Sequence, residues 1–216
     1  MISPTKLHYI YDPFCGWCYG AAPLVTAAME LDGLKVVPHG GGMVTGTNAK
    51  KMSPEWREFV RPHEQRITAL SGQSFGTAYR AGTQFNYDVM LDSGPPTAAM
   101  LAAEEVAGVG LAMLKRLQVA YYLEGQPIAE ERVILSISSE LGLEPNEFSK
   151  ALEHATKQLV EHFHSTQKLL ARVGGRGFPT FAVEQGSETV NIHLGQFLGK
   201  PQEFRNAVER MVAVAN

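Results

Sequence analysis

Strand-like segments occur only near the two ends of the chain, and this distribution limits the fold more than any other feature. Segments 6–12 and 34–40 lie near the N-terminus, and segments 178–186 and 189–195 lie near the C-terminus. Each is short, apolar and rich in β-branched or aromatic residues, which is typical of buried strands. From about residue 53 to residue 173 the sequence shows only helical patterns.

Helix boundaries within this middle part are marked by residues that favour helix ends. Ser53 followed by Pro54 is a typical helix start, because serine caps the first free N–H groups and proline needs no donor there. Gly108 or Gly110 divides one long apolar segment into two helices, and a glycine pair after residue 173 ends the last helix. The segment is therefore a succession of helices that cannot take part in the sheet.

These patterns predict an α/β fold with a large all-α insertion. Residues 1–45 and 156–216 are expected to form one domain around the sheet, and residues 46–155 the helical insertion. A helix over roughly 145–173 is expected to connect the two parts. No internal repeat or low-complexity segment suggests another architecture.

Charge and hydropathy exclude several classes of partner. The net charge is −3, without a basic run that would indicate a nucleic-acid partner. No stretch approaches the roughly 18 consecutive apolar residues that a membrane helix needs, and the first residues do not resemble a signal peptide. We therefore expect a cytoplasmic protein that neither binds nucleic acid nor enters a membrane.

The two cysteines of the chain, Cys15 and Cys18, stand in the sequence DPFCGWCYG, directly after the first strand. A bridge between them closes too small a loop to stabilise the fold much, so chemistry explains the pair better. A helix that begins here presents free N–H groups and the positive end of its dipole to Cys15, and so lowers the pKa of the thiol from its usual value of about 8.5. We expect an exposed, nucleophilic Cys15 and a buried Cys18 that resolves mixed disulfides. Gly16 and Trp17 add no positive charge, which predicts a mild oxidant.

The combination of motifs resembles the thioredoxin superfamily. CGWC stands at a strand-to-helix junction, Pro23 lies inside the following helix, and GFPT at 177–180 opens a late strand. The helical insertion resembles the DsbA-like branch, and DPFCGWCYG resembles its cytoplasmic members that are often labelled protein-disulfide isomerases. The resemblance follows the whole chain in its order of elements, and the two sharp motifs stand near its ends.

The resemblance implies further site residues. Pro179 is expected to follow a cis peptide bond and to pack beside the cysteines, where it blocks metal capture by the sulfur atoms. The backbone of Phe178 is expected to bind an extended substrate as an added strand. Trp17 is either a substrate contact or a packing residue beneath the insertion. Many relatives carry a buried acid in the first strand as a proton relay, but here Asp12 is the nearest acid, and we interpret it as a turn residue. The proton route of Cys18 therefore stays open between water and Asp12.

The predicted function is thiol–disulfide exchange by the Cys15–Cys18 dithiol, as a reductase or isomerase of protein or small-molecule disulfides. We expect no metal and no organic cofactor, with glutathione or a reductase as electron partner and glutathione as a possible co-substrate. A glutathione-dependent transferase or isomerase of the same fold is the alternative, although serine commonly replaces the first cysteine there. A zinc site with His162 and His164, or a binding module without turnover, is disfavoured. The two histidines point about 200° apart on a helix, and a binding module leaves the thiol unexplained.

Overall fold

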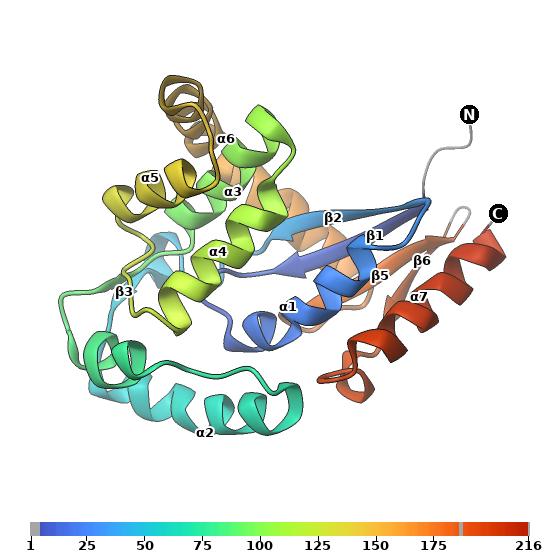
Figure 1. The fold of residues 1–216 in the computed structure, drawn as a ribbon, viewed down its shortest axis with the longest axis horizontal. Coiled ribbons are helices and arrows are strands. Elements are labelled where there is room, and N and C mark those ends of the chain that lie inside the picture. The colour runs from blue at the N-terminus through green and yellow to red at the C-terminus, as the bar shows by residue number, and fades with distance from the viewer. Residues whose placement is uncertain (1–4, 186–187, 216) are drawn as a thin grey trace.

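A four-stranded sheet forms the centre of the structure, a computed structural model that describes residues 5–185 and 188–215 (Figure 1). The strand order is β2-β1-β5-β6. All four strands occur where the sequence predicts them, namely β1 Thr5–Tyr11, β2 Leu34–Gly40, β5 Thr180–Gln185 and β6 Glu188–Ile192. β5 and β6 pair as antiparallel neighbours, while residues 186–187 of the predicted turn between them lie outside the described residues.

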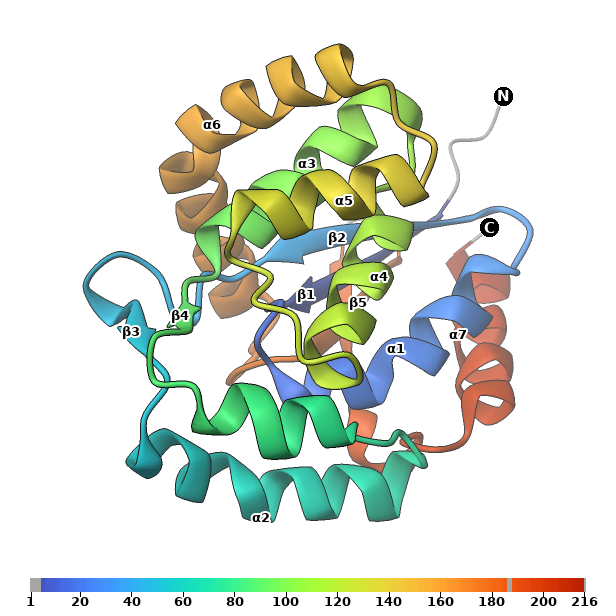
Figure 2. The same ribbon diagram turned by 60° about the vertical axis from the view of Figure 1, so that its left-hand side comes forward.

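Seven α-helices are described, and they surround the sheet and build the insertion (Figures 1 and 2). Within the described ranges, every helix is too short or too polar to span a lipid bilayer. The helices are α1 Gly16–Met29, α2 Pro54–Ser71, α3 Gly94–Ala107, α4 Gly110–Tyr122, α5 Glu131–Glu140, α6 Pro145–Arg172 and α7 Pro201–Ala215.

The register of the sheet brings distant parts of the chain together. β1 pairs in parallel with β2, which sets Tyr11 opposite Gly40, and antiparallel with β5, which sets Ile10 opposite Thr180. α1 begins a few residues after β1. The start of α1, the end of β2 and the start of β5 therefore meet at one end of the sheet.

The two faces of the sheet are covered by different helices, because successive side chains of a strand point to opposite faces. On one face Tyr9 stacks on Phe181 with ring centroids 4.7 Å apart, and Phe181 contacts Phe204 of α7. On the other face the neighbouring Ile10 belongs to an apolar cluster with Leu169 of α6. This alternation fixes the register, since a slip by one residue exchanges the faces.

The insertion contains more than helices. β3 Lys50–Lys51 and β4 Met90–Leu91 form a small antiparallel pair, which the sequence did not indicate because two residues give no alternating pattern. A single turn of π-helix, Ala78–Gly82, follows α2 and lies beside it (Figure 2). α6 runs without a break across residue 155, so the division into 1–45 with 156–216 and 46–155 stays a proposal.

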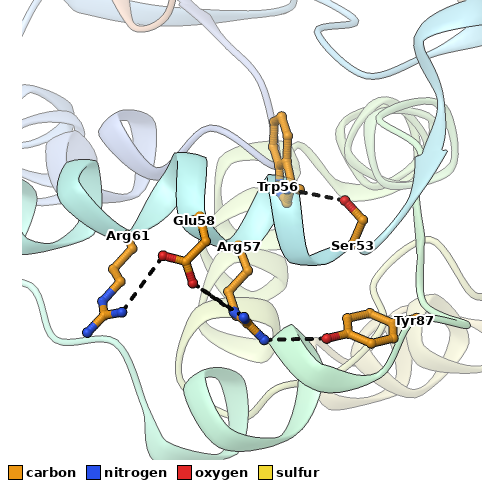
Figure 3. Close-up of polar contacts among 6 residues, drawn as sticks. All are labelled: Ser53, Trp56, Arg57, Glu58, Arg61 and Tyr87. Carbon is orange, nitrogen blue, oxygen red and sulfur yellow. Dashed lines mark hydrogen bonds and ion pairs between the residues drawn. The ribbon is translucent and has the colours of Figure 1, made fainter.

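The predicted helix ends are confirmed. Ser53 caps α2, where its Oγ accepts a hydrogen bond from the Trp56 N–H at 3.2 Å (Figure 3). Such a cap stabilises a helix by about 1 kcal/mol. Gly108 separates α3 from α4 with a φ of +67°, which glycine adopts without strain.

Candidate active site

Cys15 forms the N-cap of α1. Its backbone is extended, with φ −85° and ψ 109°, and its Sγ accepts a hydrogen bond from the Cys18 N–H at 3.2 Å. The sulfur thus takes the place that a serine or aspartate oxygen occupies in an ordinary N-cap. Because the first N–H groups of a helix lack intrahelical partners and lie at the positive end of the dipole, this position favours an anionic sulfur.

The structure corrects one prediction about Cys15, which we expected to be exposed. Only 5% of the residue is exposed, because the Phe178 loop covers it and the Cys15 Sγ lies 3.5 Å from the Phe178 carbonyl oxygen. Cys15 instead lines a cavity of about 380 Å³. A substrate disulfide must therefore enter this cavity to reach the sulfur.

Cys18 is fully buried one helical turn later, as predicted. Burial raises the pKa of the Cys18 thiol, and its interactions with Cys15 raise the pKa further, while a hydrogen bond with the Asp12 backbone lowers it. Cys18 therefore holds its proton in the reduced pair. A buried, protonated Cys18 beside a sulfur at the helix N-terminus divides the pair into a resolving and an attacking sulfur.

The loop beside the cysteines contains the predicted cis peptide bond, between Phe178 and Pro179. The Phe178 ring packs onto Gly41, where an added Cβ would lie 2.1 Å from ring carbons. The Gly41 N–H donates to the Tyr11 carbonyl at 2.7 Å, and its carbonyl accepts from Gln167 Nε2 at 2.9 Å. Gly41, in the glycine run Gly40, Gly41 and Gly42 at the end of β2, therefore provides a close contact that seats Phe178 beside Cys15.

The cavity lies between the two predicted parts of the chain. Trp17, Met43 and Phe178 line it from the sheet side, and α2 with the α4 end lines it from the insertion, through Trp56, Phe59, His63, Glu64, Ile67, Tyr121 and Tyr122 among others. Trp17 lines the cavity and also packs against α2, since its Nε1 donates to His63 Nδ1 at 3.3 Å. Trp17 therefore packs beneath the insertion and also lines the cavity, whereas its contact with a substrate stays a prediction.

α2 has one aromatic and one ionic side. Figure 3 shows Trp56 pointing away from Arg57, Glu58 and Arg61, which gather on the opposite side of the helix. There Arg57 pairs with Glu58 at 3.3 Å and donates to the Tyr87 hydroxyl at 3.4 Å. In this first part of the helix the aromatic Trp56 faces the cavity, while Glu58 and Arg61 face solvent.

Asp12 has a larger role than the turn residue that we predicted. Its Oδ1 does accept the Phe14 N–H at 2.9 Å, as a turn residue would, but it also accepts from Ser93 Oγ at 2.9 Å. Its Oδ2 accepts the Met43 N–H at 2.6 Å. Burial raises the pKa of the Asp12 carboxyl to about 6, and these hydrogen bonds limit the rise. The Asp12 carboxylate therefore links the turn before α1, through Phe14, to the segment after β2, through Met43, and to the insertion, through Ser93.

Of the histidines, His63 lines the cavity that contains Cys15, whereas His8, His39, His162 and His164 lie outside it. His8 Nδ1 and His39 Nε2 are 2.9 Å apart, and burial lowers the pKa of His39 to about 4. His162 points inward and accepts the Gly40 N–H at 3.1 Å, whereas His164 is exposed. Among residues 5–185 and 188–215, no three His, Cys, Asp or Glu side chains are grouped so that they could hold a metal ion.

A comparison with protein families identifies the family of this chain. The model of the DSBA-like thioredoxin domain family matches residues 6–202. This chain belongs to that family. Membership accounts for the CxxC pair at the start of α1, the cis-proline loop and the helical insertion within one sheet-based fold.

One similar protein of known structure matches this chain over nearly the whole length of both proteins. The cytosolic disulfide reductase DsbM from Pseudomonas aeruginosa is 44% identical, with 97% of this chain and 99% of that chain covered and a TM-score of 0.91. The same protein solved with GSH matches at 44% identity with a TM-score of 0.89, covering 96% of this chain and 99% of that one. The ClpXP adapter protein SpxH from Bacillus subtilis is 22% identical, covering 82% of this chain, which spans 58% of that relative's length.

These findings confirm the main sequence predictions. The chain has the DsbA-like thioredoxin fold with a helical insertion, and it is a thiol–disulfide oxidoreductase with a Cys15–Cys18 pair. The roles of Trp17, Phe178 and Pro179 in substrate binding stay predictions. Sequence reasoning missed Glu64 and the insertion tyrosines as walls of the cavity, because nothing in a helical pattern distinguishes a cavity wall from a core.

Proposed function

We propose that this protein reduces disulfides in the cytoplasm and receives its electrons from glutathione. The observation that carries the proposal is Cys15, whose sulfur accepts the Cys18 N–H at the start of α1 and which lines a cavity. The relative DsbM is named as a cytosolic disulfide reductase and was solved with GSH, which supports the direction, the compartment and the electron donor.

The first step is attack on the substrate disulfide. The Cys15 thiolate attacks one substrate sulfur, the substrate S–S bond breaks, and the other sulfur leaves as a thiolate that takes a proton from water. The product is a mixed disulfide between Cys15 and half of the substrate. We assign the pairing with an extended substrate to the backbone of the cis-proline loop, and the Phe178 carbonyl, 3.5 Å from the Cys15 sulfur, supports this assignment.

The second step is resolution by Cys18. Cys18 attacks the Cys15 sulfur, the Cys15–Cys18 bond forms, and the second substrate thiol leaves. We assign the Cys18 proton to this departing thiolate through water, because both Asp12 oxygens are engaged by Phe14, Ser93 and Met43. Asp12 supplies a negative charge that helps to keep Cys18 protonated until the mixed disulfide forms.

Glutathione closes the cycle. One glutathione thiolate attacks the Cys15–Cys18 bond to give a mixed disulfide on Cys15, and a second one releases glutathione disulfide and the free dithiol. One substrate disulfide and two glutathiones thus become two substrate thiols and one glutathione disulfide. The cycle requires neither a metal nor an organic cofactor.

A turnover assay tests this function. We expect catalytic amounts of the protein to accelerate insulin reduction by glutathione, followed through NADPH consumption by added glutathione reductase. Conjugation of glutathione to an aromatic halide, measured in parallel, tests the transferase alternative. Conjugation that survives Cys18→Ser, with no acceleration of insulin reduction, would overturn the proposal.

A further inference from the structure

Glu64 places a buried carboxylate in the wall of the cavity that contains Cys15. It belongs to α2, and only 5% of the residue is exposed. The other groups that line this cavity from the insertion are aromatic or aliphatic apart from His63 and the hydroxyls of the tyrosines. A carboxylate in such surroundings requires hydrogen-bond donors, because burial without them costs several kcal/mol.

The contacts of Glu64 satisfy only one of its two oxygens. Oε1 accepts from the Tyr79 hydroxyl at 2.9 Å and from Gln84 Nε2 at 2.7 Å. Within the part of the chain that the structure describes, no hydrogen bond reaches Oε2. An ionised carboxylate offers about four acceptor sites. Oε2 therefore retains the capacity to accept from a donor that enters the cavity.

The hydrogen bonds from Tyr79 and Gln84 do not by themselves require a glutamate at position 64. A glutamine at position 64 would offer the same Oε1 acceptor to both donors. Burial raises the pKa of Glu64, while the two hydrogen bonds and the charge of Arg80 lower it. Arg80 lies over the Phe75 ring, and among the described residues it forms no ion pair with Glu64. What glutamate adds over glutamine is a negative charge with a free oxygen.

We propose that Glu64 determines substrate specificity, and that its Oε2 accepts a hydrogen bond from an ammonium group of the disulfide. This inference rests on the proposed function, since it names the class of disulfide that the cavity selects. A cavity of about 380 Å³ is within the usual range for binding a small organic group. A charge-assisted hydrogen bond in surroundings of low dielectric gives both affinity and orientation.

The test compares disulfides that differ only in charge. Bis(aminoalkyl) disulfides of increasing chain length are paired with bis(hydroxyalkyl) disulfides of the same lengths, and kcat/KM is measured for each. We expect the wild-type protein to prefer the amino compound by about tenfold or more at the length that reaches Glu64, as for one hydrogen bond to a charged group. Equal kcat/KM values for the amino and hydroxyl compounds at every length would overturn the proposal without any variant.

Two variants connect the preference to Glu64. Glu64→Gln keeps the Oε1 acceptor and removes the charge, so we expect the amino-to-hydroxyl ratio to fall to the ratio of the rates at which free glutathione reduces the two compounds. Glu58→Gln removes the same charge from the outer side of α2, and we expect the ratio to stay at its wild-type value. A ratio that Glu64→Gln leaves unchanged, or that Glu58→Gln lowers as much, contradicts the assignment. Failure of the wild-type protein to reduce either class would instead contradict the proposed function.

Discussion

Replacing Cys15 with serine is expected to reduce disulfide turnover by about 10³-fold or more, to the rate of the uncatalysed reaction. Removal of a covalent nucleophile generally has effects of this order or larger. Serine is a preferred N-cap residue, so its Oγ can accept the Cys18 N–H that Cys15 Sγ accepts now. The fold should therefore survive, and the loss should report chemistry alone.

The measurement is insulin reduction by glutathione with purified Cys15→Ser, beside an equilibrium unfolding curve of the same protein. We expect an unfolding free energy within about 1 kcal/mol of the wild-type value, because the cap is preserved. A folded variant that retains a substantial part of the turnover would show that another group attacks the substrate.

Asp12 is expected to make the stability of the protein depend on pH by about 3 kcal/mol. Its carboxyl pKa rises from 3.8 to about 6 on folding, chiefly through burial. One pKa unit corresponds to about 1.4 kcal/mol. Between about pH 4 and pH 6 the folded state binds a proton that the unfolded state has released. The unfolding free energy therefore falls as the pH rises through this window, and the contribution is fully present only below it.

His39 acts in the opposite direction and hides this effect in the wild-type protein. Burial lowers its pKa from 6.5 to about 4, so the unfolded state binds the extra proton between these values. Its contribution to the unfolding free energy therefore rises with pH over nearly the same window. Because the two contributions offset one another, only the difference between the wild type and a variant isolates Asp12.

The measurement is the unfolding free energy of the wild type and of Asp12→Asn from pH 3 to pH 7. We expect the wild-type value minus the variant value to decrease by about 3 kcal/mol across this range. His39→Gln should give a difference that changes with the opposite sign. A wild-type minus Asp12→Asn difference that stays constant with pH would show that Asp12 does not bind its proton more tightly in the folded state.

The sequence predicted those parts of the fold that depend on local pattern. The strands that contain Tyr9 and Phe181 are predicted by short apolar runs, and the start of α2 is predicted by Ser53. The cysteine pair and Pro179 form a matched set of motifs, so their meeting at one end of the sheet was predictable from the resemblance. Each of these signals is contained in a few neighbouring residues.

Features that depend on contacts between distant residues were not predictable in this way. The burial of Cys15 depends on how closely the Phe178 carbonyl approaches it, and the role of Gly41 depends on the same ring. Asp12 follows a strand and precedes a proline, so its local sequence indicates a turn and nothing of Ser93, 81 residues away. Glu64 has the helical spacing of an ordinary α2 residue, and only the tertiary structure places it beside the cavity.

Mass spectrometry of the protein after exposure to glutathione disulfide tests the central claim most directly. With Cys18→Ser we predict a stable adduct of one glutathionyl group per chain, mapped to Cys15, because the resolving thiol is absent. The wild-type protein should instead lose two hydrogens, with a Cys15–Cys18 bond and no lasting adduct. A Cys18→Ser protein that stays unmodified, together with a wild-type protein that forms no bond between its cysteines, would contradict the account.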